Sequence, residues 1–219
     1  CKYFKVIIFN LKSELNFKAD FIASLFSFTI HVLVFNFLWD FILGNKLTFN
    51  YTKNQLIWYV IIGELITYTS SRSYKKISDM IKTGQVSIML IKPINFLGYI
   101  ICEESIAIVK FIFNFIFAII LGVLLAGNIR LNFINIIYFS LSMFFSIFLL
   151  TSLQVVIGIS AFIIEENRAI YNIVIKFILL LLFTPLEFFS NKIKILLKML
   201  PTTYVVYPTS KIFVKFNFI

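Results

Sequence analysis

The side chains of this chain that could do chemistry are a few polar and ionisable groups inside long apolar stretches. A charge near the centre of a bilayer is costly, so such groups usually face protein or water and often mark a transport pathway. For His31 the alternative is a hydrogen bond between helices, and others near the ends of apolar stretches could reach the membrane surface. The candidate pathway residues are His31, Asn36, Glu64, Lys110, Asn114, Gln154 and Lys176.

The motifs of nucleotide and metal chemistry are missing from the sequence. It contains neither G-x-x-x-x-G-K-[ST] nor G-x-G-x-x-G, so it has no Gly-rich loop to bind phosphates, and one histidine excludes paired-histidine metal sites. Paired glutamates such as Glu103-Glu104 and Glu165-Glu166 also occur in intramembrane glutamate proteases, but the further histidines of those enzymes are absent. We expect no enzyme activity, no cofactor and no metal. Any energy source must be another chain.

Composition indicates an integral membrane protein. Of 219 residues, 60% are apolar and 28 are Phe, well above the roughly half-apolar composition of soluble domains. The net charge of +10 could suggest nucleic-acid binding in a soluble chain. Here the Lys and Arg residues lie in short clusters between apolar blocks, which membrane topology explains better. We expect membrane lipid as a partner and no nucleic acid.

The elements that must position the candidate groups are predicted to be membrane-spanning helices. At about 1.5 Å per residue, a helix of about 20 residues crosses a hydrocarbon core near 30 Å. The fold class is therefore an all-α integral membrane protein with one transmembrane domain over 1–219. The predicted spans are 21–43, 54–69, 104–126, 131–164 and 169–183, the fourth being long enough that it must tilt or project.

Two further segments are predicted to lie along the membrane surface. From Phe4 to Leu15 apolar residues share one helical face and lysines lie away from it, as in an interfacial helix. In 185–208 leucines and isoleucines alternate with Lys192, Lys194 and Lys198 between prolines, which favours a re-entrant hairpin.

The distribution of Lys and Arg gives an orientation. These residues concentrate in the N-terminal segment and in 70–92, so the positive-inside rule places both in the cytoplasm. With five crossings, the lysines after residue 190 fall on the outside, against the rule. They are tolerable there if that segment folds back into the membrane surface.

The segment 77–93 combines an amphipathic turn with a terminating proline. Ile77, Met80 and Ile81 share a helical face, Gly84 can end that turn, and a second apolar run stops at Pro93. A surface-lying linker is the simpler alternative. As a docking element for another protein, its candidate residues are Ile77, Asp79, Met80, Ile81, Gly84, Val86, Leu90, Lys92 and Pro93.

Short stretches at 17–21, 38–40, 81–93, 184–189 and 200–208 occur in an order that resembles the permease subunits of type-2 ABC exporters, in particular a six-span bacterial branch. The resemblance implies a cytoplasmic coupling helix after span two, an extracellular re-entrant hairpin after span five, and a sixth span. It also implies an ABC ATPase subunit and a second permease copy or homologue as partners, in the bacterial cytoplasmic membrane. By our reading the sequence lacks the sixth span and an initiating Met.

The leading hypothesis is the membrane subunit of an ATP-driven exporter. Closure of the ATPase dimer would push on 77–90, docked in a groove of that subunit, and tilt the spans to move substrate outward. A second hypothesis is a non-transporting membrane protein, such as an immunity or assembly factor or an enzyme with an unrecognised site. A secondary transporter would usually show two related halves, and the sequence shows no such repeat.

Overall fold

The computed structural model of the chain describes residues 18–44, 51–70, 73–91, 95–96, 98–100, 106–127, 133–164 and 166–217, and the regular elements among them are helices. The predicted N-terminal interfacial helix, Lys92 and Pro93 lie outside these residues. The α-helices with bounds are α2 (Lys18–Gly44), α3 (Lys53–Thr69), α4 (Ser73–Lys82), α5 (Gln85–Ile91), α7 (Ile106–Ala126), α8 (Phe133–Ile159), α9 (Arg168–Phe183), α10 (Asn191–Met199) and α11 (Thr203–Asn217). Two 3-10 turns are η1 (Ser160–Phe162) and η2 (Leu186–Phe188).

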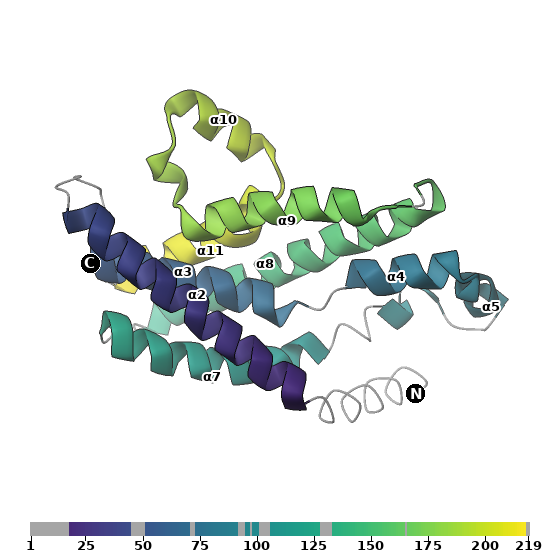
Figure 1. Cartoon of the computed structure of the whole chain (residues 1–219), viewed down its shortest axis with the longest axis horizontal. Helices are drawn as coiled ribbons and strands as arrows, with labels where there is room; N and C mark the ends of the chain where they lie inside the picture. The colour runs from purple at the N-terminus through teal and green to yellow at the C-terminus, as the bar shows by residue number, and fades with distance from the viewer. Residues whose placement is uncertain are drawn as a thin grey trace.

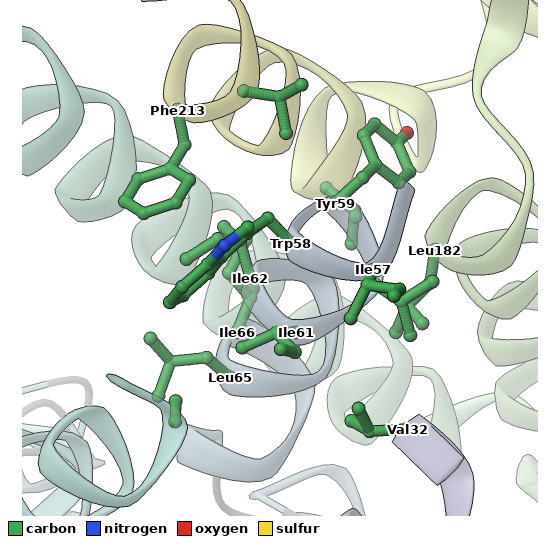
Figure 2. Packing of buried hydrophobic residues seen from close by; sticks show 14 of the residues in the cluster. Val32, Ile57, Trp58, Tyr59, Ile61, Ile62, Leu65, Ile66, Leu182 and Phe213 are labelled. Carbon is green, nitrogen blue, oxygen red and sulfur yellow. The ribbon is translucent and has the colours of Figure 1, made fainter. Parts of the chain in front are cut away.

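Helix α3 forms the centre of the bundle. It packs against α2, α7, α9 and α11, and Figure 2 shows its side chains directed toward Phe213 of α11, Leu182 of α9 and Val32 of α2. A helix that is apolar all round has no face suited to water, so it is stable only when neighbours cover it on every side. Trp58 and Tyr59 are fully buried for this reason.

Two polar interactions fix the orientation of α3. Thr52 and Gln55 form a capping box at its first turn, in which each side chain accepts a hydrogen bond from the other residue's backbone N–H. The Tyr59 hydroxyl, deep in the core, donates to the Leu181 carbonyl of α9 at 2.8 Å. The second bond satisfies a hydroxyl that would otherwise be stranded among apolar side chains.

Helices α7, α8 and α9 run roughly along the longest axis of the molecule, and α2 crosses them obliquely (Figure 1). Two described helices are long and apolar enough to cross a membrane, Phe21–Leu43 and Phe133–Phe162, and Lys110–Ala126 is a shorter apolar helix. The outward face of α2 carries a stripe of exposed apolar side chains at helical spacing, which suits contact with lipid. The stripe consists of Ile22, Phe26, Ile30, Val34, Phe37 and Phe41.

Each of the five ranges predicted for membrane spans contains a described helix, which begins at Ile106 in the third range and at Phe133 in the fourth. The sequence predicted one continuous span over 131–164, whereas α8 ends at Ile159 and continues as the turn η1. The Ser160 hydroxyl donates to the Ile157 carbonyl at 2.6 Å, and the Ser160 carbonyl accepts from the backbone N–H groups of Ile163 and Ile164. These bonds satisfy backbone groups at the helix end and turn the chain toward α9.

The segment after α9 also differs from its prediction. The hairpin 185–208 was expected to end at Pro208, but Pro208 lies inside α11, which begins at Thr203. The sequence predicts no helix over 203–217, because a proline is typical of a helix boundary. Pro208 removes one helical hydrogen bond, yet α11 is held by its neighbours, since Val206 and Thr209 are fully buried. In chain order α11 follows the hairpin, where the resemblance implied a sixth span.

Candidate functional site

The amphipathic segment forms two short helices at one end of the bundle. In Figure 1, α4 and α5 lie beside the C-terminal end of α8 and the start of α9, away from α10. Helix α5 lies within the segment 77–93 predicted for the docking element, and α4 begins at Ser73, four residues before it. Gly84 lies in the turn between them with φ of 71°, a left-handed conformation that L-residues other than glycine rarely adopt. The turn therefore depends on this glycine.

The apolar face of α4 is turned inward, toward the rest of the chain. Ile77 is 1% exposed and Met80 is also buried. Ile77 lies directly against Gly158 of α8, where an added Cβ would come within 2.8 Å of the Ile77 Cβ. This close approach lets α4 lie flat on α8. The sequence predicts that Ile77 and Met80 face a groove on a partner, whereas in the structure they pack on the chain's own bundle.

Two buried side-chain amides lock α4 in this position. Asn167, just before α9, accepts a hydrogen bond from the Ser78 hydroxyl at 3.1 Å and donates to the Ile157 carbonyl at 2.8 Å. One side chain thus joins α4, the end of α8 and the start of α9. Gln154 of α8 accepts from the Ser73 backbone N–H at 3.0 Å and donates to the Ser70 hydroxyl at 2.6 Å.

An aromatic stack and an ion pair add to the same contact. The rings of Tyr74 and Tyr171 stack with centroids 3.7 Å apart and an interplanar angle of 14°. Lys82 lies 3.5 Å from the Glu166 carboxylate. Both side chains are exposed, so this ion pair adds little to stability. The buried amides and the stacked rings carry the attachment, so α4 is positioned to move together with α8 and α9.

Replacing Asn167 with leucine is expected to loosen α4. The change removes the bonds to Ser78 and to the Ile157 carbonyl and leaves buried polar groups unpaired, at a cost of about 1 kcal/mol or more. Trypsin should then cleave faster after the lysines of α4. The matched control is Asn172→Leu, because Asn172 is exposed on the same helix. Equal cleavage rates for the two variants would contradict the role given to Asn167.

The outward side of the α4–α5 element is where a partner could bind. Asp79, Gly84 and Leu90 are exposed, whereas Val86 is buried and Ile81 is partly buried. On α5 the exposed apolar side chains are Ile88 at 59%, Leu90 at 67% and Ile91 at 85%. A pocket of ≈330 Å³ lies beside the turn, lined by Lys75, Lys76, Asp79, Met80, Thr83 and Gln85.

Among the candidate pathway residues, His31 and Glu64 are the two that the structure joins. His31 Nδ1 of α2 lies 3.1 Å from Glu64 Oε1 of α3. The Glu64 side chain is 2% exposed, whereas that of His31 is 47% exposed and packs edge-on against the ring of Phe183. Phe183 in turn stacks on Phe35 at 3.9 Å. A half-exposed imidazole therefore sits among aromatic rings on the outer side of α2 and α9.

The other candidates lie apart from this pair. Gln154 belongs to the attachment of α4, and Lys176 is exposed on α9. Asn114 is buried on α7, and Lys110 is partly buried at the start of the same helix. The side-chain oxygen of Asn36 is buried and has no hydrogen-bond partner among the residues that the structure describes. The described residues thus show no continuous polar route through one chain.

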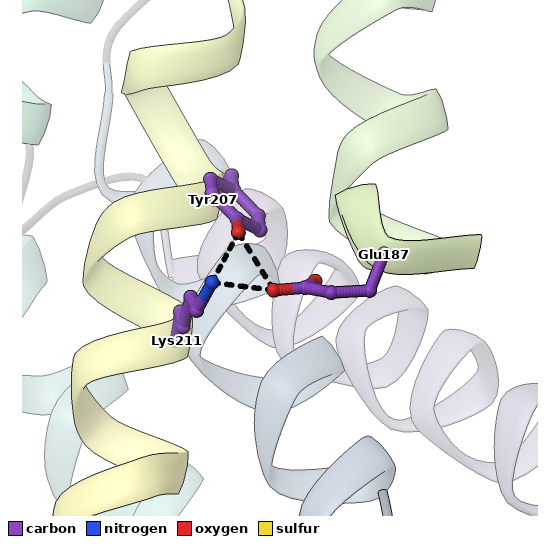
Figure 3. A network of polar contacts seen from close by, with 3 residues as sticks. All are labelled: Glu187, Tyr207 and Lys211. Carbon is purple, nitrogen blue, oxygen red and sulfur yellow. Dashed lines mark hydrogen bonds and ion pairs between the residues drawn. The ribbon is translucent and has the colours of Figure 1, made fainter. Parts of the chain in front are cut away.

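A second polar cluster lies at the end of the bundle opposite α4. Glu187 of η2 accepts hydrogen bonds from Tyr207, at 2.7 Å, and from Lys211, both on α11 (Figure 3). Burial alone would raise the pKa of the Glu187 carboxyl, but the bonds from Lys211 and Tyr207 outweigh it and hold that pKa below its ordinary value. Phe188, the next residue, packs edge-on against Trp39 of α2. The cluster fastens η2 to the bundle.

Sequence reasoning missed most of these attachment residues. No pattern in the sequence singles out Asn167, and Lys211 follows Pro208, where the predicted hairpin ends. Helical periodicity places Ser78 opposite the apolar face of Ile77 and Met80, yet Ser78 is buried against Asn167. The only available signal was a polar residue directly next to an apolar face that was expected to be buried. The sequence could not show which side chain would bond to that residue.

A bundle of apolar helices with an outward apolar stripe and a laterally attached amphipathic pair suits a membrane protein. A sequence model of one protein family, described as ABC-2 family transporter protein, matches residues 21–218. The chain belongs to the ABC-2 transporter family, as its resemblance had implied. No curated protein and no solved structure matches the chain.

Membership gives the general role of the chain. It is a membrane permease of an ABC transporter, a class that is generally a non-catalytic transport subunit and that works with an ABC ATPase subunit and as a dimer. The sequence-based expectation of a type-2 ABC permease is thereby confirmed.

Proposed function

We propose that this permease couples ATP hydrolysis by a separate ABC ATPase subunit to export, and that α4–α5 is its coupling element. The observation that carries the proposal is the two-sided character of this element. Its inner face is fixed to α8 and α9 through Ile77, Asn167 and Tyr74, whereas α5 presents exposed apolar side chains away from the bundle. Contiguous exposed apolar side chains are typical of a protein-binding surface.

The two faces of the α4–α5 element suggest how the movement of the ATPase would reach the permease. The exposed residues Asp79, Gly84 and Leu90 would contact the ATPase, and Ile77, Met80 and Val86 would pass its movement to the permease. A closing ATPase dimer that displaces α5 must displace α4, and α4 cannot move without α8 and α9 while the buried hydrogen bonds hold. Lys92 and Pro93 remain candidates for the end of the element.

The direction of transport and the orientation belong to the same proposal. The cluster of Lys and Arg around α4 favours a cytoplasmic position for this end, with η2 and α10 outside, in a bacterial cytoplasmic membrane. A second permease copy or homologue would complete the transporter. The half-exposed His31, held by Glu64, is the best-placed polar group for a pathway between two copies, because it lies on the outer side of α2 rather than inside the bundle.

The substitution Ile91→Asp tests the docking surface. Ile91 is the most exposed of the three apolar residues on α5, so the change adds a charge to the interface without entering the core. Copurification of the ABC ATPase encoded beside this chain is expected to fall about tenfold, the effect of about 1.4 kcal/mol lost from binding. Stimulation of its ATPase activity should fall in parallel.

The control is Asn191→Asp, which adds the same charge to an exposed residue of α10 at the other end. It should retain the ATPase. If Ile91→Asp also retains it, α5 is not the docking surface. If the unaltered chain copurifies with no ATPase, coupling itself is wrong, and an immunity or assembly factor becomes the better hypothesis.

A further inference from the structure

The imidazole of His31 uses one of its two ring nitrogens within the chain. Nδ1 lies 3.1 Å from the carboxyl group of Glu64, whose side chain is 2% exposed. In the described part of the chain the ring makes no other hydrogen bond, and the His31 side chain is 47% exposed. The second nitrogen, Nε2, is therefore the one that a molecule outside the bundle can reach.

His31 lies near the middle of a helix that is long enough to cross a membrane. This apolar helix runs from Phe21 to Leu43, so His31 is ten residues from one end and twelve from the other. At 1.5 Å per residue these separations are about 15 and 18 Å. Water and lipid ester groups lie beyond a hydrocarbon core about 30 Å thick, so neither supplies a hydrogen-bond partner at this depth. A polar N–H left unpaired there is costly.

The number of protons on the pair makes Nε2 a donor. A carboxylate beside a neutral imidazole leaves one net negative charge, which is unfavourable away from water. One further proton removes that charge, as an imidazolium that donates from Nδ1 or as a carboxylic acid that donates to Nδ1. An imidazolium has a hydrogen on both nitrogens, and an imidazole that accepts at Nδ1 has its hydrogen on Nε2. In either form Nε2–H is a donor.

The surface around this donor is apolar. The rings of Tyr68 and Phe183 lie with their centroids 6.3 and 6.4 Å from that of the imidazole. On α2 the neighbouring Ile30 and Val34 are 42% and 52% exposed. The exposed cation of α9 that is closest in sequence to Phe183 is Lys176, seven residues away, which is about 10 Å along the helix. One donor thus lies among aromatic and aliphatic walls.

We propose that His31 Nε2–H binds an uncharged carbonyl group, of the amide or ester kind, on an apolar molecule that this permease transports. The carbonyl oxygen accepts the hydrogen bond, and the apolar remainder of the molecule packs on the rings of Phe183 and Tyr68. Small-molecule sites generally combine such walls with a few polar groups that fix orientation. The inference rests on the proposed transport function and names the class of molecule that fits this surface.

A charged substrate and a second copy of the chain fit the same surface less well. A carboxylate or phosphate would bring a net charge to the middle of the membrane, beside a pair that is itself neutral. In a dimer with two-fold symmetry, equivalent residues near the axis face each other, so His31 would meet a second donor. An uncharged carbonyl group supplies an acceptor without either cost.

The chain contains a single histidine, which permits a direct test by NMR. The full chain, free of any histidine tag and labelled with ¹⁵N only in histidine, is placed in phosphatidylcholine nanodiscs without ATPase or ATP. The probe is benzanilide, an apolar amide, and its control is bibenzyl, which has a similar shape but no carbonyl group. Nε2 should carry a hydrogen throughout, and its resonance should shift with benzanilide and stay unchanged with bibenzyl.

Two substitutions separate the outward nitrogen from the inward one. The amide of glutamine reaches about the position of Nε2 and keeps an outward donor, whereas that of asparagine reaches about the position of Nδ1 and keeps the bond to Glu64. Binding of radiolabelled benzanilide above that of empty nanodiscs should be retained by His31→Gln. It should weaken about tenfold in His31→Asn, as for loss of one hydrogen bond. Fluorescence of the buried Trp39 and Trp58 verifies that both variants are folded.

Several results would overturn the inference. They are an Nε2 that lacks a hydrogen, an equal shift with bibenzyl, and equal binding of benzanilide by the two variants. An Nε2 that is hydrogen-bonded without a probe, and loses this bond when the protein is diluted in lipid, would show that a second copy is its partner. These measurements involve no ATPase. Failure of the proposed coupling would appear in the copurification experiment and would leave them unchanged.

Discussion

Replacing His31 with leucine is expected to lower the free energy of unfolding by about 3 kcal/mol, the lower end of the range for removing one partner of a buried ionisable pair. Equilibrium unfolding in mixed micelles measures this change. Fluorescence of Trp39 and Trp58 reports unfolding, because both indoles are buried. Trp39 belongs to α2 and Trp58 to α3, the two helices that His31 and Glu64 connect.

The reason is the position of Glu64 on the central helix. Its side chain is 2% exposed, and within the described part of the chain His31 is the only side chain that hydrogen-bonds its carboxyl group. Leucine offers no donor, and apolar neighbours cannot replace one. Without this bond the Glu64 carboxyl group is buried with no hydrogen bond to replace its contacts with water. This unfavourable burial lowers the free energy of unfolding. The half-exposed position of His31 sets the estimate at the lower end.

Two companion variants separate the pair from simple packing. Glu64→Gln keeps a polar group opposite the imidazole and should cost about 1 kcal/mol, the value of an ordinary hydrogen bond. The double variant His31→Leu and Glu64→Leu removes both polar groups and should recover most of the loss, since an apolar pair of similar size is often neutral. A double variant as unstable as His31→Leu would show that the imidazole acts by shape alone.

A functional readout distinguishes a pathway role from a structural one. If His31 lines a route between two permease copies, Glu64→Gln should reduce transport more than it reduces stability, because it changes the charge held beside His31. If the pair only joins α2 to α3, transport and stability should fall in proportion. Transport by the reconstituted permease with its ATPase, compared with the unfolding measurement, decides between these outcomes.

Local signals in the sequence were sufficient to place most helices. Long apolar stretches define α2, α3, α7, α8 and α9 because length and hydropathy are properties of each segment alone. In the segment 77–93, periodicity predicted a helical turn that ends at Gly84, and the structure places Gly84 in a left-handed turn between α4 and α5. Membership in the ABC-2 family was anticipated from the order of short motifs.

What failed was the assignment of neighbours. Helical periodicity showed that α4 has an apolar face, but an apolar face can cover the chain's own bundle or a partner. The missing side chain of Gly158 lets Ile77 pack closely on α8, so this face covers the chain's own bundle rather than a partner. Gly158 lies about 80 residues after Ile77 in the sequence. The pairs His31–Glu64 and Glu187–Lys211 also depend on how helices pack, which no local pattern contains. A proline-based boundary concealed α11, whose stability comes from its buried neighbours.

The two ends of the permease therefore use different attachments. Neutral amides and stacked rings hold α4, so its contact with α8 is insensitive to salt. A charged cluster, Glu187 with Tyr207 and Lys211, holds η2 and with it α10. Acid can weaken the second attachment and leave the first intact. A pH titration of stability should consequently report on the η2 end.

Replacing Glu187 with glutamine is expected to lower the free energy of unfolding near neutral pH by about 2 kcal/mol, as for loss of hydrogen bonds to a charged group. The Glu187 side chain is 21% exposed and that of Lys211 is 30% exposed, so solvent screens the pair only in part. The folded-state pKa of Glu187 is depressed. Its contribution is therefore present above the ordinary pKa of glutamate and is lost as pH falls through the folded-state value.

Stability of the unaltered protein should thus decrease on acidification, whereas that of Glu187→Gln should decrease less, and the two curves should converge in acid. Lys211→Met should lose the same pH-dependent contribution from the other side of the pair. The matched control is Asp40→Asn, because Asp40 and Lys53 form an exposed ion pair at 2.6 Å and exposed pairs contribute only about 0–1 kcal/mol. If Asp40→Asn and Glu187→Gln change stability equally, partial burial gives the Glu187 cluster no special strength, and the attachment of η2 must come from Phe188 and its aromatic neighbours instead.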